Sequence, residues 1–146
     1  MNTIRILVGC ALSFGLVACG GSSGGGSSGP NPNATLSAGQ YDANLETNCG
    51  GERDTDEGNG TITRSGDMYT ISIPGIGDLG PAELVDGRIE IPSFSYFDSE
   101  DGADIDVAGF TLNLTADNRL SGRFNFDWDD GDDQCSGSGS ISIFPS

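Results

Sequence analysis

The segment Leu120-Ser-Gly-Arg-Phe-Asn-Phe-Asp-Trp128 places large apolar side chains on alternate residues, at Leu120, Phe124, Phe126 and Trp128. A period of two is typical of a β-strand that buries one face. The same period recurs from residue 34 to the end of the chain, and no stretch has the period of an amphipathic helix. The sequence therefore predicts an all-β domain.

Turn residues divide this region into eight expected strands, at 38–48, 60–65, 68–73, 82–85, 88–97, 103–115, 119–128 and 134–144. Three links are tight: Ser65-Gly66-Asp67, Asp86-Gly87 and Asp117-Asn118. Gly, Asn and Asp tolerate the positive φ that hairpin turns need. Pro92 and Gly109 fall inside expected strands where the alternation changes face, which predicts a bulge or a sheet corner at each. Short links throughout predict an antiparallel meander.

The N-terminus has the pattern of an export signal. Met1 to Arg5 carries one positive charge, and the apolar run from Ile6 to Ala18 is too short to span a bilayer as a permanent helix. We expect residues 1–18 to be a signal peptide.

The apolar run ends in Leu16-Val17-Ala18-Cys19, which resembles the lipobox of bacterial lipoprotein precursors. The resemblance implies cleavage before Cys19, diacylglycerol on its sulfur and a further acyl chain, such as palmitate, on the new amino group. Gly20 stands where an Asp would imply retention at the inner membrane, so the resemblance implies an outer-membrane lipoprotein. An ordinary secretory signal with an incidental cysteine is the alternative.

Residues 20–33 read GGSSGGGSSGPNPN and hold no apolar side chain that a core needs. We expect residues 19–33 to be a lipidated cysteine and a flexible tether, and residues 34–146 to be the folded domain. Such a tether reaches about 20 Å and lifts the domain clear of the head groups without fixing its orientation.

Two cysteines, Cys49 and Cys135, remain in the folded domain once Cys10 is removed and Cys19 lipidated. An exported domain with two cysteines predicts a disulfide, with free thiols or a metal site as alternatives. Cys49 ends the first expected strand and Cys135 begins the last. A bridge requires these strands to be antiparallel neighbours, which predicts a closed or nearly closed barrel, lipocalin-like in shape. A two-sheet β-sandwich with the same bridge is the alternative fold.

A meander places alternate links at opposite ends, which separates the charges. The tight turns share one end with both termini, and each has one Asp and one Arg. The other end gathers the expected loops 49–59, 74–81, 98–104 and 129–134, which hold a single base, Arg53. Their acids are Glu52, Asp54, Asp56, Glu57, Asp78, Asp98, Glu100, Asp101, Asp104, Asp129, Asp130, Asp132 and Asp133.

Two strings in those loops, Asp98-Ser-Glu-Asp-Gly-Ala-Asp104 and Asp127-Trp-Asp-Asp-Gly-Asp-Asp133, resemble the Asp-rich loops of calcium-binding repeats. The glycine stands at the fifth position instead of the sixth, and no Glu follows at the twelfth, so the register is not that of an EF-hand. Solvated acidic turns are the alternative. The candidate calcium ligands are Asp98, Glu100, Asp101, Asp104, Asp129, Asp130, Asp132 and Asp133.

The composition excludes several classes of function. The chain has 22 Asp and Glu, six Arg, no Lys and no His, for a formal net charge of −16. We expect no enzyme, because no imidazole base, nucleophile–base pair or cofactor motif is present. We expect no nucleic-acid partner, because phosphates are repelled. We expect a membrane-anchored protein whose acidic end binds a cation or a cationic protein. A small-ligand carrier that uses the barrel interior, a structural envelope lipoprotein and acidity as an adaptation to saline surroundings are the alternatives.

Overall fold

The computed structural model describes residues 29–146, which form ten antiparallel strands and no helix. Candidate membrane-spanning helices are absent from this part of the chain. The strands are β1 (Gly39–Cys49), β2 (Glu52–Ser65), β3 (Met68–Ile73), β4 (Gly77–Val85), β5 (Arg88–Ile91), β6 (Phe94–Asp98), β7 (Ala103–Val107), β8 (Phe110–Ala116), β9 (Arg119–Asp129) and β10 (Gln134–Pro145).

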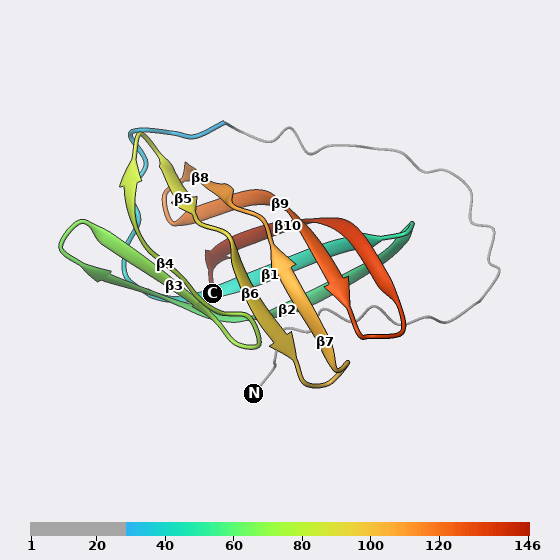
Figure 1. Ribbon diagram of the computed structural model, residues 1–146. Coiled ribbons are helices and arrows are strands. Elements are labelled where there is room, and N and C mark those ends of the chain that lie inside the picture. The colour runs from blue at the N-terminus through green and yellow to red at the C-terminus, as the bar shows by residue number, and fades with distance from the viewer. Residues whose placement is uncertain (1–28) are drawn as a thin grey trace.

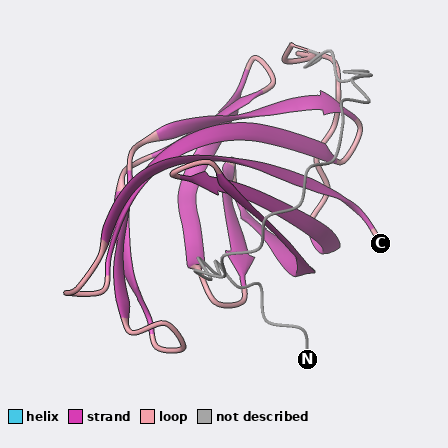
Figure 2. Cartoon of the chain, turned by 90° about the vertical axis from the view of Figure 1, so that its right-hand side faces the viewer, coloured by secondary structure: helices cyan, strands magenta, loops and turns pink. Residues whose placement is uncertain are grey.

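Eight of these strands form a closed ring in the order β1-β2-β3-β4-β5-β8-β9-β10, which confirms the predicted barrel (Figure 1). The ring closes because β10 pairs with β9 on one edge and with β1 on the other. Leu45 of β1 faces Ile141 of β10, and the ladder runs from Tyr41 to Asn48. The strands curve around a common interior (Figure 2), so the alternative of two separate sheets is wrong.

The remaining strands, β6 and β7, continue β5 and β8. The register between β5 and β8 pairs Ile91 with Phe110, and the register between β6 and β7 pairs Phe94 with Val107, with no shift between the two ladders. Each expected long strand is therefore one strand broken once, at Pro92-Ser93 and at Ala108-Gly109. At both breaks the inward side changes from one residue parity to the other.

The two breaks lie against each other. A Cβ at Gly109 would come within 3.3 Å of the Ile91 carbonyl oxygen and 3.4 Å of the Ser93 nitrogen. The small residue allows this close backbone approach, and both strands change face together so that their cross-strand pairs are kept. The prediction of bulges or corners at Pro92 and Gly109 is confirmed.

The sequence-based bounds of two strands are wrong. β2 begins at Glu52 and β4 at Gly77, so most of the expected loops 49–59 and 74–81 is strand. β1 and β2 are joined by the two-residue turn Gly50-Gly51, whose φ values are +63° and +92°. These strand segments lack alternating apolar residues, which is the signal that sequence reasoning used. In β2 the inward-facing residues of this segment include Asp54 and Asp56, whereas in β4 the inward-facing Leu79 is a single apolar residue.

The barrel interior is filled by side chains. Aliphatic and aromatic residues from every strand of the ring form one buried cluster, and Phe124 and Phe126 of β9 lie over Gly139 and Gly137 of β10. The apolar cavity that remains, bounded by Ile76 and Phe124 among others, has a volume of ≈ 20 Å³. That is about the space of one water molecule, so the aromatic residues pack as core.

One end of the barrel is covered by residues 31–38, which we call the strap. The Asn31 nitrogen donates to the Leu114 carbonyl oxygen at 2.8 Å, and Leu36 is buried. The turn Asp117-Asn118 holds the strap, because Asp117 Oδ1 accepts from the Thr35 nitrogen and Asn118 Oδ1 accepts from the Ser37 nitrogen, each at 2.8 Å. The chain enters the barrel at this end.

Candidate functional site

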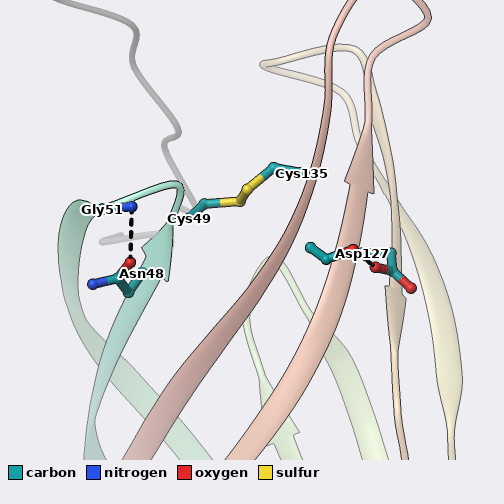
Figure 3. Close-up of a disulfide and its surroundings, with 6 residues drawn as sticks. Asn48, Cys49, Gly51, Asp127 and Cys135 are labelled. Carbon is teal, nitrogen blue, oxygen red and sulfur yellow. Dashed lines mark hydrogen bonds between the residues drawn. A yellow bond between two sulfur atoms is a disulfide. The ribbon is translucent and has the colours of Figure 1, made fainter.

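The end opposite the strap carries the turns 50–51, 74–76, 99–102 and 130–133, and we call it the rim. The predicted disulfide lies there: Cys49 and Cys135 are bonded, with their Cα atoms 6.0 Å apart (Figure 3). Next to it, Asn48 Oδ1 accepts a hydrogen bond of 3.2 Å from the Gly51 nitrogen, which fixes the β1–β2 turn. The bridge therefore ties two neighbouring strands at the rim and supports the closure of the ring.

Most of the acids expected in loops lie on strands near the rim. Glu52, Asp54, Asp56 and Glu57 belong to β2, and Asp78 to β4. Asp98 ends β6, Asp104 lies in β7 and Asp129 ends β9. The acids that lie in turns are Glu100, Asp101, Asp130, Asp132 and Asp133.

Four carboxylates form a compact block on the outside of the barrel, which we call the outer ladder: Asp104, Asp106, Asp127 and Asp129. Asp104 faces Asp129 and Asp106 faces Asp127 across the β7–β9 register. Side chains directly opposite each other in antiparallel strands lie about 5 Å apart, and like charges there repel. The outer ladder thus costs folding free energy at neutral pH, and a bound cationic group would remove that cost.

The outer ladder has polar neighbours on both flanks. Ser95 on β6 donates to Asp106, Ser136 on β10 donates to Asp127 at 2.5 Å, and Gln134 Nε2 donates to Asp129 Oδ2 at 2.8 Å. Open hollows lie along its length, one of ≈ 460 Å³ lined by Asp106, Asn125 and Asp127 among others.

Sequence reasoning did not include Asp106 or Asp127 among the candidate ligands. Both lie inside strands, where the alternation indicates the apolar residues that face the core. The signal was present: in Asp104-Ile-Asp-Val107 and Asp127-Trp-Asp129, an acid occupies every second position. Two such strands, once paired, place their acids on one face.

A second set of acids faces the interior at the rim, and we call it the mouth acids: Asp54, Asp56, Asp98 and Asp101. Asp54 and Asp56 lie opposite the inward-facing Thr47 and Leu45 of β1, so they share the inner side. Asp54 Oδ2, Asp101 Oδ2 and the Tyr96 hydroxyl are buried, and none has a hydrogen-bond partner within residues 29–146.

The charges of the mouth acids act on two groups, Asp101 and Tyr96. Burial raises the pKa of Asp101, and the charges of Asp98, Glu100, Asp54 and Asp130 raise it further. Burial also raises the pKa of Tyr96, with smaller effects from Asp98 and Asp56. Asp54 and Asp56 belong to β2, so charges on β2 act on groups of the β6–β7 hairpin across the mouth.

The two strings that resemble calcium loops form turns whose carboxylates bind their own backbone. Asp98 Oδ1 accepts from the Glu100 nitrogen at 2.9 Å, and Asp129 Oδ1 from the Gly131 nitrogen at 2.8 Å. Asp130 Oδ1 accepts from the Asp132 and Asp133 nitrogens at 2.8 and 2.6 Å. These two hydrogen bonds lower the pKa of Asp130. Among the described residues, no three Cys, Asp or Glu side chains are arranged to hold one metal ion.

Acids at the strap end have different neighbours. Arg64 pairs with Asp67 at 3.6 Å, and the Arg64 guanidinium lies 5.3 Å from the centre of the Tyr69 ring. Asp117 accepts from the backbone nitrogen and the hydroxyl of Thr35. At this end a base pairs with Asp67 and the strap binds Asp117, whereas the rim gathers many carboxylates.

No protein-family model matches this chain. No curated protein matches it either. Cys19 and the expected signal peptide lie outside the described residues. The geometry and charge of the barrel are therefore the observations on which a function is argued.

Proposed function

We propose that this protein is a lipid-anchored, non-catalytic protein of the cell envelope, and that its acidic rim binds a cationic protein. The observation that carries the proposal is the outer ladder, where two pairs of carboxylates face each other on adjacent strands at the end of the barrel remote from the strap. Relief of that repulsion is a source of binding free energy for a positively charged partner.

The breadth of the charge favours a protein partner over a single ion. Carboxylates at the rim extend over β2, β4, β6, β7 and β9 and over two turns. The net charge of −16 adds a long-range field that speeds the approach of positive partners. A lysozyme-like enzyme is a cationic protein whose charge suits such a surface.

The anchor would attach to the domain at the end remote from this surface. Lipidation at Cys19 and the Gly/Ser-rich tether would fasten the domain through the strap, which lies at the opposite end from the rim. Two or more acyl chains hold a protein stably at a membrane. The rim is then the end of the domain farther from the attachment point, where a soluble partner has access to it.

Calcium is a second candidate ligand. The turns at 98–104 and 129–133 place several carboxylates and carbonyl groups within short stretches of chain, which are the ligands that Ca²⁺ takes. Binding requires Asp98, Asp129 and Asp130 to exchange their hydrogen bonds to backbone nitrogens for the ion. Calcium would then change the conformation of these turns as it binds.

The test measures binding of a lysozyme, as a basic probe, to the wild type and to Asp104→Asn/Asp106→Asn/Asp127→Asn/Asp129→Asn. The control variant, Asp67→Asn/Glu83→Gln/Asp86→Asn/Glu90→Gln, removes the same charge near the strap end. We expect only the outer-ladder variant to lose most of the affinity, and we expect wild-type affinity to fall steeply as ionic strength rises. Equal losses in both variants would overturn the proposal.

Calcium is tested on the same proteins by calorimetry and thermal unfolding. A chelated ion raises the unfolding temperature by mass action and persists in moderate salt. If Ca²⁺ binds and the lysozyme does not, the second candidate replaces the first.

A further inference from the structure

β6 is an edge strand. It pairs with β7 on one side, and the sheet order ends at β6 on the other. Its sequence, Phe-Ser-Tyr-Phe-Asp, has high β propensity and contains no Lys or Pro, the residues that protect exposed edges. Phe97 is 60 % exposed, the highest value among the large hydrophobic residues that are exposed here.

The hydrogen-bonding direction along β6 follows from β7. The Ala108 nitrogen donates to the Asn125 carbonyl oxygen at 3.0 Å, in the register that pairs β7 with β9. Directions alternate along a strand, so the backbone groups of Asp104 and Asp106 point to β9. Those of Ala103, Ile105 and Val107 point to β6. The partners of those residues are Phe94, Tyr96 and Asp98. It follows that Ser95 and Phe97 direct their N–H and C=O groups to the free edge.

Two strands of the ring are only partly paired at the rim. β2 pairs with β3 only from Thr61 to Ser65, so its first half, Glu52 to Asn59, is paired with β1 alone. β4 pairs with β5 only through Leu84 and Val85. The barrel wall is therefore incomplete at the rim, between the first half of β2 and β6.

The chemistry of this opening is mixed. Ile76, Leu79, Phe94 and Tyr96 line the apolar cavity at its inner part. Nearer the rim are the mouth acids, of which Asp54 and Asp101 each have a buried Oδ2 atom without a hydrogen-bond partner among the described residues. Buried carboxylate oxygens without donors are costly, and an incoming Lys or Arg would supply the donors.

We propose that an extended, basic segment of a partner protein adds to the free edge of β6 as a further strand. Its backbone pairs with Ser95 and Phe97, its apolar side chains contact Phe97 on the outer side, and its alternate Lys or Arg side chains reach Asp54 and Asp101 on the inner side. This goes beyond the proposed function, because it assigns a different surface and requires main-chain pairing in addition to charge. Strand addition to an exposed edge is a recurrent mode of peptide recognition. A second copy of this chain is disfavoured as the partner, because pairing of its β6 edge with this one would bring the carboxylates of the two copies together.

The test uses a capped peptide of four Lys-Val repeats as the probe, with a Glu-Val peptide and a Lys-Val peptide carrying two central prolines as controls. Ser95→Pro removes the N–H at the free edge without removing a bond to β7, and proline is tolerated at such edge positions. Ser95→Ala is its matched control, since it loses only the hydroxyl that donates to Asp106. Thermal unfolding of all variants verifies that the barrel is folded.

We expect the Lys-Val peptide to bind the wild type and Ser95→Ala alike. We expect Ser95→Pro, Phe97→Ala and Asp54→Asn/Asp101→Asn each to weaken binding about tenfold or more. Equal binding of the proline-containing peptide would show attraction by charge alone and overturn the proposal, as would unchanged binding to Ser95→Pro. A concentration-dependent dimer that Ser95→Pro abolishes would assign the edge to a second copy instead. The outer-ladder variant keeps the β6 edge, so the two proposals fail separately.

Discussion

The ring of Phe124 covers Gly139 so closely that a Cβ built on Gly139 would overlap its Cζ atom. β9 and β10 meet here with a large side chain on one strand and none on the other, and Phe126 repeats the arrangement over Gly137. Interdigitation of large and small residues is how a small barrel fills its interior without voids.

Gly139→Ala should therefore destabilise the domain by about 1–3 kcal/mol, because overpacking forces the ring or the backbone to move. The neighbouring change Ser138→Ala, on the exposed outer side, should stay within about 0.5 kcal/mol. Denaturant unfolding of both variants measures the difference. Phe124→Leu in the Gly139→Ala background should recover part of the loss, and a Gly139→Ala protein as stable as Ser138→Ala would contradict the packing.

Loss of the Cys49–Cys135 bridge should reduce the free energy of unfolding by about 2–5 kcal/mol. The bond joins residues 86 positions apart, so it restricts the unfolded chain over most of the domain. Chemical unfolding with and without reductant measures the effect on the wild type. Cys49→Ser/Cys135→Ser should have the same free energy of unfolding as the reduced wild type, with or without reductant. A wild type that is equally stable in the presence of reductant would refute the prediction.

The barrel could be predicted because its evidence is local and redundant. Alternation in β9, the tight turns at Gly66, Gly87 and Asn118 and the positions of two cysteines all agree with one closed meander. The breaks at Pro92 and Gly109 could also be predicted, since each is marked by a residue that a regular strand disfavours.

The candidate site could be predicted only in part. The acidic end was evident from the meander, but the opposition of Asp106 and Asp127 depends on the β7–β9 register, which local sequence does not determine. Asp54 and Asp56 looked like loop residues because hydrophobic alternation stops where β2 lines the mouth. Polar residues that face inward at the end of a barrel give no hydrophobic signal.

Asp101→Asn should stabilise the domain at neutral pH. The pKa of Asp101 is raised above its ordinary 3.8, so the native state holds its proton more tightly than the unfolded state does. The stability that protonated Asp101 contributes is fully present below the ordinary pKa of 3.8, and it is lost as the pH rises through the raised pKa. Asp130 has a lowered pKa, so its effect on stability has the opposite pH dependence. The stability that it contributes is present above pH 3.8 and is lost on acidification.

Unfolding temperatures measured from about pH 3 to pH 8 check this pair. Relative to the wild type, Asp101→Asn should gain stability with rising pH, whereas Asp130→Asn should lose it. Matching profiles for the two variants would contradict the environments assigned to them.

Cys19 should carry the lipid. Cells given a fatty-acid analogue should label the wild type and leave Cys19→Ala unlabelled, because the Leu16-Val17-Ala18-Cys19 string places the modified cysteine at the mature N-terminus. Detergent phase partitioning and N-terminal analysis provide independent checks. A mature protein that begins at another residue, or a wild type that stays in the aqueous phase, would refute the anchor.

The strap should be held chiefly by the Asp117-Asn118 turn. Asp117 Oδ1 accepts a hydrogen bond from the Thr35 nitrogen. Asn118 Oδ1 accepts hydrogen bonds from the Ser37 nitrogen and the Tyr41 hydroxyl. Asn118→Gly keeps the residue's φ of +58° accessible while it removes the amide oxygen. We expect this variant and Asp117→Ala each to cost about 1–2 kcal/mol.

Amide hydrogen exchange distinguishes release of the strap from general destabilisation. The amides of Thr35 and Ser37 should exchange faster in both variants, while those of β9 and β10 keep their order of protection. Thr63→Ala, on an exposed position of β2 away from the strap, is the control and should leave both amides unchanged. If Thr35 and Ser37 stay protected without the turn's oxygens, burial of Leu36 is what holds the strap, and Leu36→Ala should then release it.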